Sequence, residues 1–130
     1  HMGLSINGRY FSLKANGLDF NANLQDIIEL IYRKKLPVLA IELDVSFTLD
    51  QCKIEFDKFD RTIAHVVTCL NPIKSVLDFP SPGKLSELLI ELDANGSLEK
   101  KTAWNINESS LELPDYTIED IHTHLVALSK

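Results

Sequence analysis

The chain has 130 residues, of which 45% are hydrophobic and 25% are charged, which is typical of one soluble globular domain and argues against extended disorder. Its net charge of −6 repels phosphate backbones and disfavours direct binding to nucleic acid. No apolar run approaches the roughly 18 residues of a membrane span and no leader is evident, so we expect a cytosolic protein without membrane contact. We expect residues 2–130 to form a single domain, with His1 as a cloning scar.

The N-terminal part of the sequence predicts a β-hairpin followed by a helix. In residues 4–13, Asn7-Gly8 separates two short β-prone runs, which favours a type I′ turn. In residues 23–35, apolar side chains recur with helical spacing and Asn23 is a suitable N-cap. Three basic residues end this helix, where the helix dipole favours cations, so they need no nucleic-acid partner to explain them.

Two longer apolar patterns follow that helix. Residues 36–43 form a nearly continuous apolar run, which predicts a central strand buried on both faces and reached by a parallel crossover. Thr48 with Gln51 makes a capping box, and the apolar spacing beyond it predicts one long helix over residues 49–70.

The charged residues on this long helix are either an acid–base site or a solvated face. At 100° per residue, His65 points away from the apolar stripe with Arg61 beside it, whereas Asp60 falls on the other flank. The three groups therefore do not converge, and we expect His65→Ala to be harmless. Ile54 also points outward among these charges, so Ile54 and Arg61 are candidate partner contacts, although single exposed apolar residues are common.

The remaining sequence predicts mainly strands. Residues 73–80 favour a strand, and residues 86–104 favour a hairpin with its turn near residue 95. Residues 109–115 indicate a loop or edge strand, and residues 117–128 predict a last amphipathic helix. The expected fold is one α+β domain with three helices and a mostly antiparallel or mixed sheet of about five or six strands.

Acidic residues concentrate in the C-terminal part of the chain. Residues 81–130 carry nine acids against four lysines, which favours a basic protein partner unless the charge serves solubility alone. In the expected hairpin three glutamates face outward, with Glu91 opposite Glu99, and three later acids have no capping or pairing role. The candidate partner-binding acids are therefore Glu87, Glu91, Glu99, Glu108, Glu112 and Asp115.

Motifs for catalysis or metal binding are missing from the sequence. His122 and His124 are two residues apart on the expected last helix, so their side chains diverge and cannot share a metal ion. The chain has no nucleophile elbow, no phosphate-binding glycine loop and no dinucleotide fingerprint. We therefore predict no catalytic residue, no metal ligand and no cofactor, and an enzyme is the less favoured class.

Three stretches of the sequence are NGRYFSLKANGLD at 7–19, CLNPIKSVLDFP at 69–80 and LPDYTIEDIH at 113–122. Together with the order of elements, they resemble immunity proteins of bacterial contact-dependent growth inhibition systems. The resemblance implies a small cytosolic bacterial protein that binds and neutralises one cognate toxin domain, commonly a nuclease. Such nucleases have basic substrate clefts, to which an acidic inhibitor surface is complementary.

The resemblance supplies no shared catalytic residues, so the candidate contacts rest on the charge argument alone. A secretion chaperone is the alternative binding protein, because these chaperones are also small, acidic, cytosolic α+β proteins and are usually homodimers. The sequence leaves the oligomeric state and the partner open.

Overall fold

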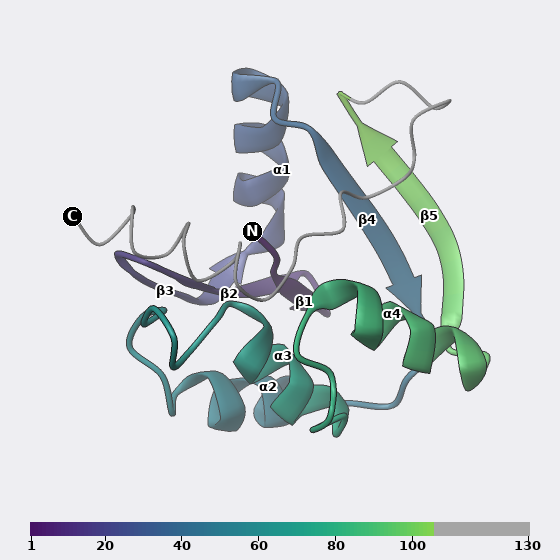
Figure 1. Ribbon diagram of the computed structural model, residues 1–130. Helices are drawn as coiled ribbons and strands as arrows, with labels where there is room; N and C mark the ends of the chain where they lie inside the picture. The colour runs from purple at the N-terminus through teal and green to yellow at the C-terminus, as the bar shows by residue number, and fades with distance from the viewer. Residues whose placement is uncertain (106–130) are drawn as a thin grey trace.

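The structure is a computed structural model that describes residues 1–105. It is an α+β domain with four helices and two small antiparallel sheets in this part of the chain (Figure 1). The expected α+β class is confirmed, whereas the expected three helices and single larger sheet are wrong. None of the described helices is long and apolar enough to cross a membrane. The edge strand and last helix expected over 109–128 lie outside the described residues.

The first sheet has three antiparallel strands in the order of the sequence. They are β1 (Leu4–Ile6), β2 (Arg9–Lys14) and β3 (Gly17–Asn23). Asn7 and Gly8 connect β1 to β2 with φ angles of 51° and 74°, so the predicted type I′ hairpin is confirmed. Strand β3 was not predicted from the sequence, and its register against β2 shifts at a bulge.

Helix α1 (Leu24–Lys34) begins where β3 ends. The Asn23 side chain accepts a hydrogen bond from the Gln25 backbone N–H at 3.0 Å, which confirms the predicted N-cap. The helix ends at Lys35 in the left-handed conformation, with φ 52°. The start of this helix is therefore set by its own sequence.

The second sheet is a two-stranded ribbon of β4 (Val38–Leu43) and β5 (Leu98–Trp104), which extends from the end of α1 toward α4 (Figure 1). The expected central strand buried on both faces is wrong. In the described residues β4 pairs with β5 alone, antiparallel, and its side chains are half-buried or exposed. The expected parallel crossover is also wrong, because the partner of β4 comes more than 50 residues later instead of from the first hairpin.

Helix α2 (Leu49–Phe56) begins with the predicted capping box. Gln51 N–H donates to the Thr48 hydroxyl at 3.1 Å, and the Gln51 side chain accepts from Thr48 N–H at 2.8 Å. The helix stops at Asp57, so the predicted single helix over 49–70 is wrong.

Tertiary hydrogen bonds replace helical ones in the loop after α2. Thr62 N–H donates to the Lys14 oxygen of β2 at 2.9 Å, and Ile63 and Val67 form a β-bridge around a tight turn. Within that turn His65 has φ 64°. Helix α3 (Leu70–Leu77) then occupies residues for which the sequence predicted a strand.

Helix α4 (Leu85–Ala94) replaces the first strand of the expected hairpin. Leu88 and Leu92 are buried, at 2% and 1% exposure, whereas Ile90 is 68% exposed. A strand would have placed all three side chains on one face, and only helical spacing separates Ile90 from the other two. The expected hairpin over 86–104 is therefore wrong, although its second strand exists as β5.

The hydrophobic core lies between the first sheet and helices α2, α3 and α4, which are grouped below that sheet in Figure 1. The Phe11 ring of β2 contacts the Phe56 ring of α2 with a centroid distance of 5.3 Å, and both side chains are fully buried. Leu88 and Leu92 belong to the same cluster and fix the orientation of α4. Consequently the opposite side of α4, including Ile90, faces away from the core.

Candidate protein-binding surface

A tight turn joins α4 directly to β5. Gly96 N–H donates to the Asp93 oxygen at 2.9 Å, and Ser97 N–H donates to the Leu92 oxygen at 2.8 Å. Gly96 has φ 68°, a conformation that glycine adopts without the strain of a Cβ atom. This turn holds the last turn of α4 beside the first residues of β5.

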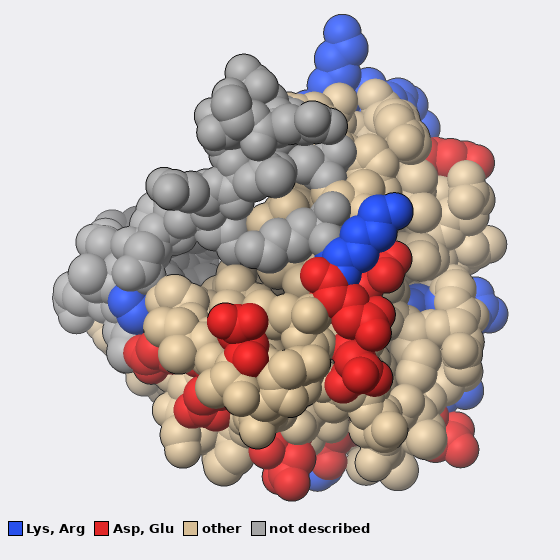
Figure 2. All heavy atoms as spheres, turned by 90° about the vertical axis from the view of Figure 1, so that its right-hand side faces the viewer, with Lys and Arg blue, Asp and Glu red and all other residues tan. Residues whose placement is uncertain are grey.

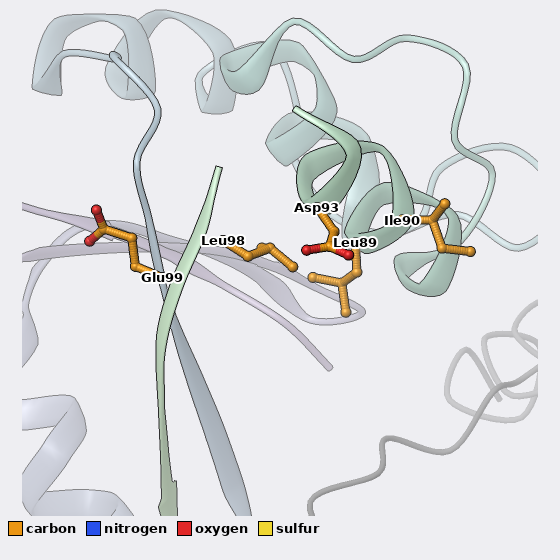
Figure 3. A pocket seen from close by; sticks show the side chains of 5 residues that line it. All are labelled: Leu89, Ile90, Asp93, Leu98 and Glu99. Carbon is orange, nitrogen blue, oxygen red and sulfur yellow. The ribbon is translucent and has the colours of Figure 1, made fainter. Parts of the chain in front are cut away.

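A hollow of about 370 Å³, open to solvent, lies between these two elements, and we call it the α4–β5 groove. Its lining residues are Leu89, Ile90, Asp93, Leu98 and Glu99. Figure 3 shows that the side chains of Leu89, Asp93 and Leu98 point toward one another, whereas Ile90 and Glu99 point outward on either side. The groove therefore has a leucine floor with the Asp93 carboxylate over it, whereas the Glu99 carboxylate lies on the far side of β5.

The pairing of β4 with β5 brings further acids to this end of the molecule. A bulge between the pairs Ile41–Lys101 and Leu43–Leu98 leaves Glu99 and Lys100 opposite Glu42 in the ladder. Figure 2 shows acidic side chains gathered on this face, with a basic side chain beside them. The surface is therefore acidic but not uniformly so.

Glu42, Asp44 and Asp93 are exposed acids of this region that the sequence analysis missed. Asp44 N–H donates to the Ser97 oxygen at 2.8 Å, which places Asp44 beside the turn between α4 and β5. The signal was present in the alternation of acidic and apolar residues over 41–45, which is typical of a strand with one exposed face. This alternation was overlooked because residues 36–43 were predicted to form a strand buried on both faces.

The carboxylates of Asp93 and Glu99 make no hydrogen bond or ion pair with any described residue. Other acids do have partners, since Asp19 pairs with Lys14 at 3.1 Å and Glu55 pairs with Lys58 at 2.9 Å. The two groove carboxylates, like the exposed acids Glu42 and Asp44 near them, therefore carry charge that the fold does not use within residues 1–105.

The structure places the predicted acidic residues in different environments. Glu99 is exposed on β5 and lines the groove. Glu87 is half-buried, and its carboxylate accepts a hydrogen bond from Gly83 N–H at 2.9 Å, so it stabilises the start of α4. Glu91 is half-buried on α4 rather than on a strand, so the expected Glu91–Glu99 pair is wrong. Glu108, Glu112 and Asp115 lie outside the described residues.

The second predicted contact combined Ile54 with Arg61. Ile54 is 60% exposed on α2, as expected, and Arg61 is exposed in the loop after α2. Because the helix ends at Asp57, the two residues do not share a helical face, and that part of the prediction is wrong. Ile54 is thus a single exposed apolar residue.

A second hollow, of about 390 Å³, lies between the end of α2 and α3. Several of its polar groups are engaged within the chain: the Lys74 ammonium donates to the Pro82 oxygen at 2.7 Å, and the Ser75 hydroxyl donates to the Asn71 oxygen at 3.2 Å, whereas Asp78 is exposed. The Asn71 side chain in turn accepts from Thr68 N–H at 2.7 Å. Most polar side chains of this hollow therefore bond to one another or to nearby backbone. Fewer of them are free to bind a partner than at the α4–β5 groove.

The described residues contain two free thiols, and no group of three or more His, Cys, Asp or Glu side chains there could hold a metal ion. Cys52 is fully buried on α2, and this burial raises the pKa of its thiol from 9.0 to about 11. A thiol with a raised pKa is a poor nucleophile at neutral pH. Cys69 is half-buried at the start of α3.

No family model matches the sequence, and no solved structure matches it. Among curated proteins, the chain is 31% identical over 127 residues to a CRISPR-associated endonuclease Cas3-HD of Saccharolobus solfataricus. The match covers 95% of this chain but 51% of that protein, so the chain spans about half the length of this relative.

Proposed function

We propose that this protein is a binding protein of the immunity class, which neutralises a cognate toxin domain with a basic surface. The observation that carries the proposal is the α4–β5 groove, where an apolar floor lies beside two carboxylates, Asp93 and Glu99, that have no ion-pair partner among the described residues. The resemblance of the sequence to immunity proteins of contact-dependent growth inhibition systems supports it.

The chemistry of the surface fits an inhibitor better than a purely solubilising surface. Apolar side chains beside exposed acids supply both a contact surface and complementary charge for a basic protein. Acidic groups at its edge steer a basic partner toward it and hold its orientation. A toxin whose substrate cleft is basic would be blocked where it binds its substrate.

The direct test is co-expression in bacteria with the toxin domain encoded beside the gene for this protein. The proposal predicts that cells producing the toxin alone stop growing, that cells producing both proteins grow, and that the two proteins copurify as a complex. A toxic neighbouring domain that neither binds this protein nor is neutralised by it would refute the proposal.

The secretion-chaperone alternative makes a different prediction. Such a chaperone would be a homodimer by size-exclusion chromatography with light scattering, and would bind a secreted protein without suppressing its activity. A monomer that suppresses the toxin's activity in a purified assay favours the immunity function.

The similarity to the Cas3-HD endonuclease favours a second candidate function, a part in nucleic-acid cleavage. The net charge of −6 opposes it, because a nucleic-acid surface has to attract phosphates. Incubating the purified chain with single-stranded DNA and Mn²⁺, with EDTA as the control, tests this candidate. Mn²⁺-dependent cleavage that EDTA abolishes would establish it, and intact DNA would remove it.

A further inference from the structure

The α4–β5 groove also indicates which chemistry its partner presents. Resting on the proposed function, we propose that the groove receives one large apolar side chain of the partner, flanked in the partner's sequence by lysine or arginine. The three following observations carry this inference.

The first observation is the apolar floor and its exposed neighbour. Leu89 and Leu98 are half-buried, and their side chains meet in the groove. Ile90, at the outer edge of the groove, is 68% exposed, the same as Val66 and more than the other exposed large hydrophobic residues of residues 1–105. An apolar side chain in the groove covers Leu89 and Leu98, and a neighbouring part of the partner can cover Ile90. Both contacts remove apolar surface from water, which favours association.

The second observation is the position of the charges. Asp93 points into the groove over its floor, and Glu99 lies on the other side of β5 (Figure 3). A partner whose apolar residue is flanked by cations can place one cation near each carboxylate, and both carboxylates lack a partner among the described residues. Lys100 follows Glu99 and is exposed, so charge attraction is weakened there, and the apolar side chain has to fix the position.

The third observation is the shape of the hollow. Its volume of about 370 Å³ exceeds that of one side chain, yet it is open to solvent, whereas pockets for small molecules enclose about 70–90% of the ligand surface. An open hollow suits a side chain whose backbone stays outside, as at the anchor residues of protein interfaces. The occupant is therefore a protein segment and not a free metabolite.

The test uses the full ¹⁵N-labelled chain and three synthetic six-residue peptides, followed by two-dimensional NMR. Acetyl-KKLWKK-amide carries both the apolar centre and the flanking cations, acetyl-EELWEE-amide reverses the charge, and acetyl-KKSSKK-amide removes the apolar centre. We expect saturable shifts of the groove amides with the first peptide and none with the other two. Equal shifts with acetyl-KKSSKK-amide, or saturable shifts confined to another surface, would overturn the inference.

A matched pair of variants distinguishes binding at the groove from non-specific binding to exposed apolar side chains. Ile90→Ser removes the exposed apolar side chain on α4, and Ile54→Ser removes one of similar exposure on α2. We expect Ile90→Ser to weaken binding of acetyl-KKLWKK-amide by about tenfold or more, as for an interface anchor, and Ile54→Ser to leave it unchanged. Equal effects of the two variants would contradict the inference.

The same variants show whether the inference or the proposed function fails. If the toxin is neutralised equally by wild type and Ile90→Ser, the groove inference is refuted while the immunity function stands. If the peptide binds the groove but no toxin is neutralised, the immunity function is refuted while the groove inference stands.

Discussion

The side-chain amide of Asn105 donates a hydrogen bond to the backbone oxygen of Leu36 at 2.8 Å, and a longer one to the Ile31 oxygen at 3.4 Å. Asn105 directly follows β5, and the two acceptors lie in and just after α1. This single side chain therefore links the far end of the β4–β5 ribbon to α1. The ribbon carries Glu99, so the link also steadies one wall of the candidate binding surface.

Replacing Asn105 should destabilise the protein in two separable ways. Asn105 has φ 57°, a left-handed conformation that asparagine tolerates better than alanine, so Asn105→Ala loses the amide and is also strained, at a cost of about 2–3 kcal/mol. Asn105→Gly also loses the amide but adopts this conformation without strain, and should cost about 1 kcal/mol. Urea unfolding of the three proteins measures this difference, and equal stability of the alanine and glycine variants would argue against the left-handed conformation.

Because His65 lies in the turn between Ile63 and Val67, we expect its substitutions to affect stability differently than they would in an uninterrupted helix. With φ 64°, His65 sits where asparagine is tolerated and a β-branched residue is strained. His65→Val should therefore be less stable than His65→Asn by about 1–2 kcal/mol. In a continuous helix the two variants would be almost equal, so thermal unfolding of the pair decides between the turn and the helix.

The buried thiol of Cys52 should make stability fall at alkaline pH. Below pH 9 both folded and unfolded chains hold the proton, so this group contributes no pH dependence. Between pH 9 and about 11 the unfolded chain loses it first, because the folded pKa is raised to about 11. The free energy of unfolding then falls as pH rises, by on the order of 2–3 kcal/mol across that window.

The matched variant for this effect is Cys52→Ala. Its unfolding free energy, measured by urea titration from pH 8 to 11, should fall less steeply than that of the wild type. Parallel curves for the two proteins would show that the thiol keeps its ordinary pKa in the folded state.

The two thiols should also differ in reactivity at pH 8. Cys69 is half-buried and should react with Ellman's reagent in the native protein, whereas Cys52 should react only after unfolding. A Cys69→Ser variant should therefore show no fast-reacting thiol. Rapid labelling of that variant would mean that α2 opens readily.

Elements with local signals could be predicted from the sequence. Asn7-Gly8, the Asn23 cap and the Thr48–Gln51 box each act within a few residues, and the structure contains all three. The prediction of one helix over 49–70 was wrong because tertiary contacts compete with the continuation of the helix. Thr62 N–H donates to the Lys14 oxygen of β2, and no local sequence pattern reveals this hydrogen bond. Apolar spacing alone does not show where a helix ends.

The candidate site was predicted only in part, because it depends on the structure of α4. Leu88, Ile90 and Leu92 alternate as in a strand, yet Leu85, Leu88, Leu89 and Leu92 also fit the helical spacing. The predicted strand placed Glu91 opposite Glu99. With α4 as a strand, no groove between a helix and β5 could be predicted. Glu99 was identified correctly as exposed, whereas Asp44 and Asp93 reach the surface near it through a turn and a strand pairing that join distant residues.

The central claim is that the acids at the α4–β5 groove attract the basic partner. The most direct measurement is the association rate constant with the cognate toxin domain, by stopped flow at low and high salt, for Asp93→Lys/Glu99→Lys and for the control Glu29→Lys/Asp60→Lys. Both double variants replace two exposed acids, but the control pair lies on α1 and in the loop after α2. The account predicts that the groove variant associates about tenfold more slowly at low salt with a flattened salt dependence, and that the control retains most of the wild-type rate. Equal slowing by both variants, with unchanged thermal unfolding, would contradict it.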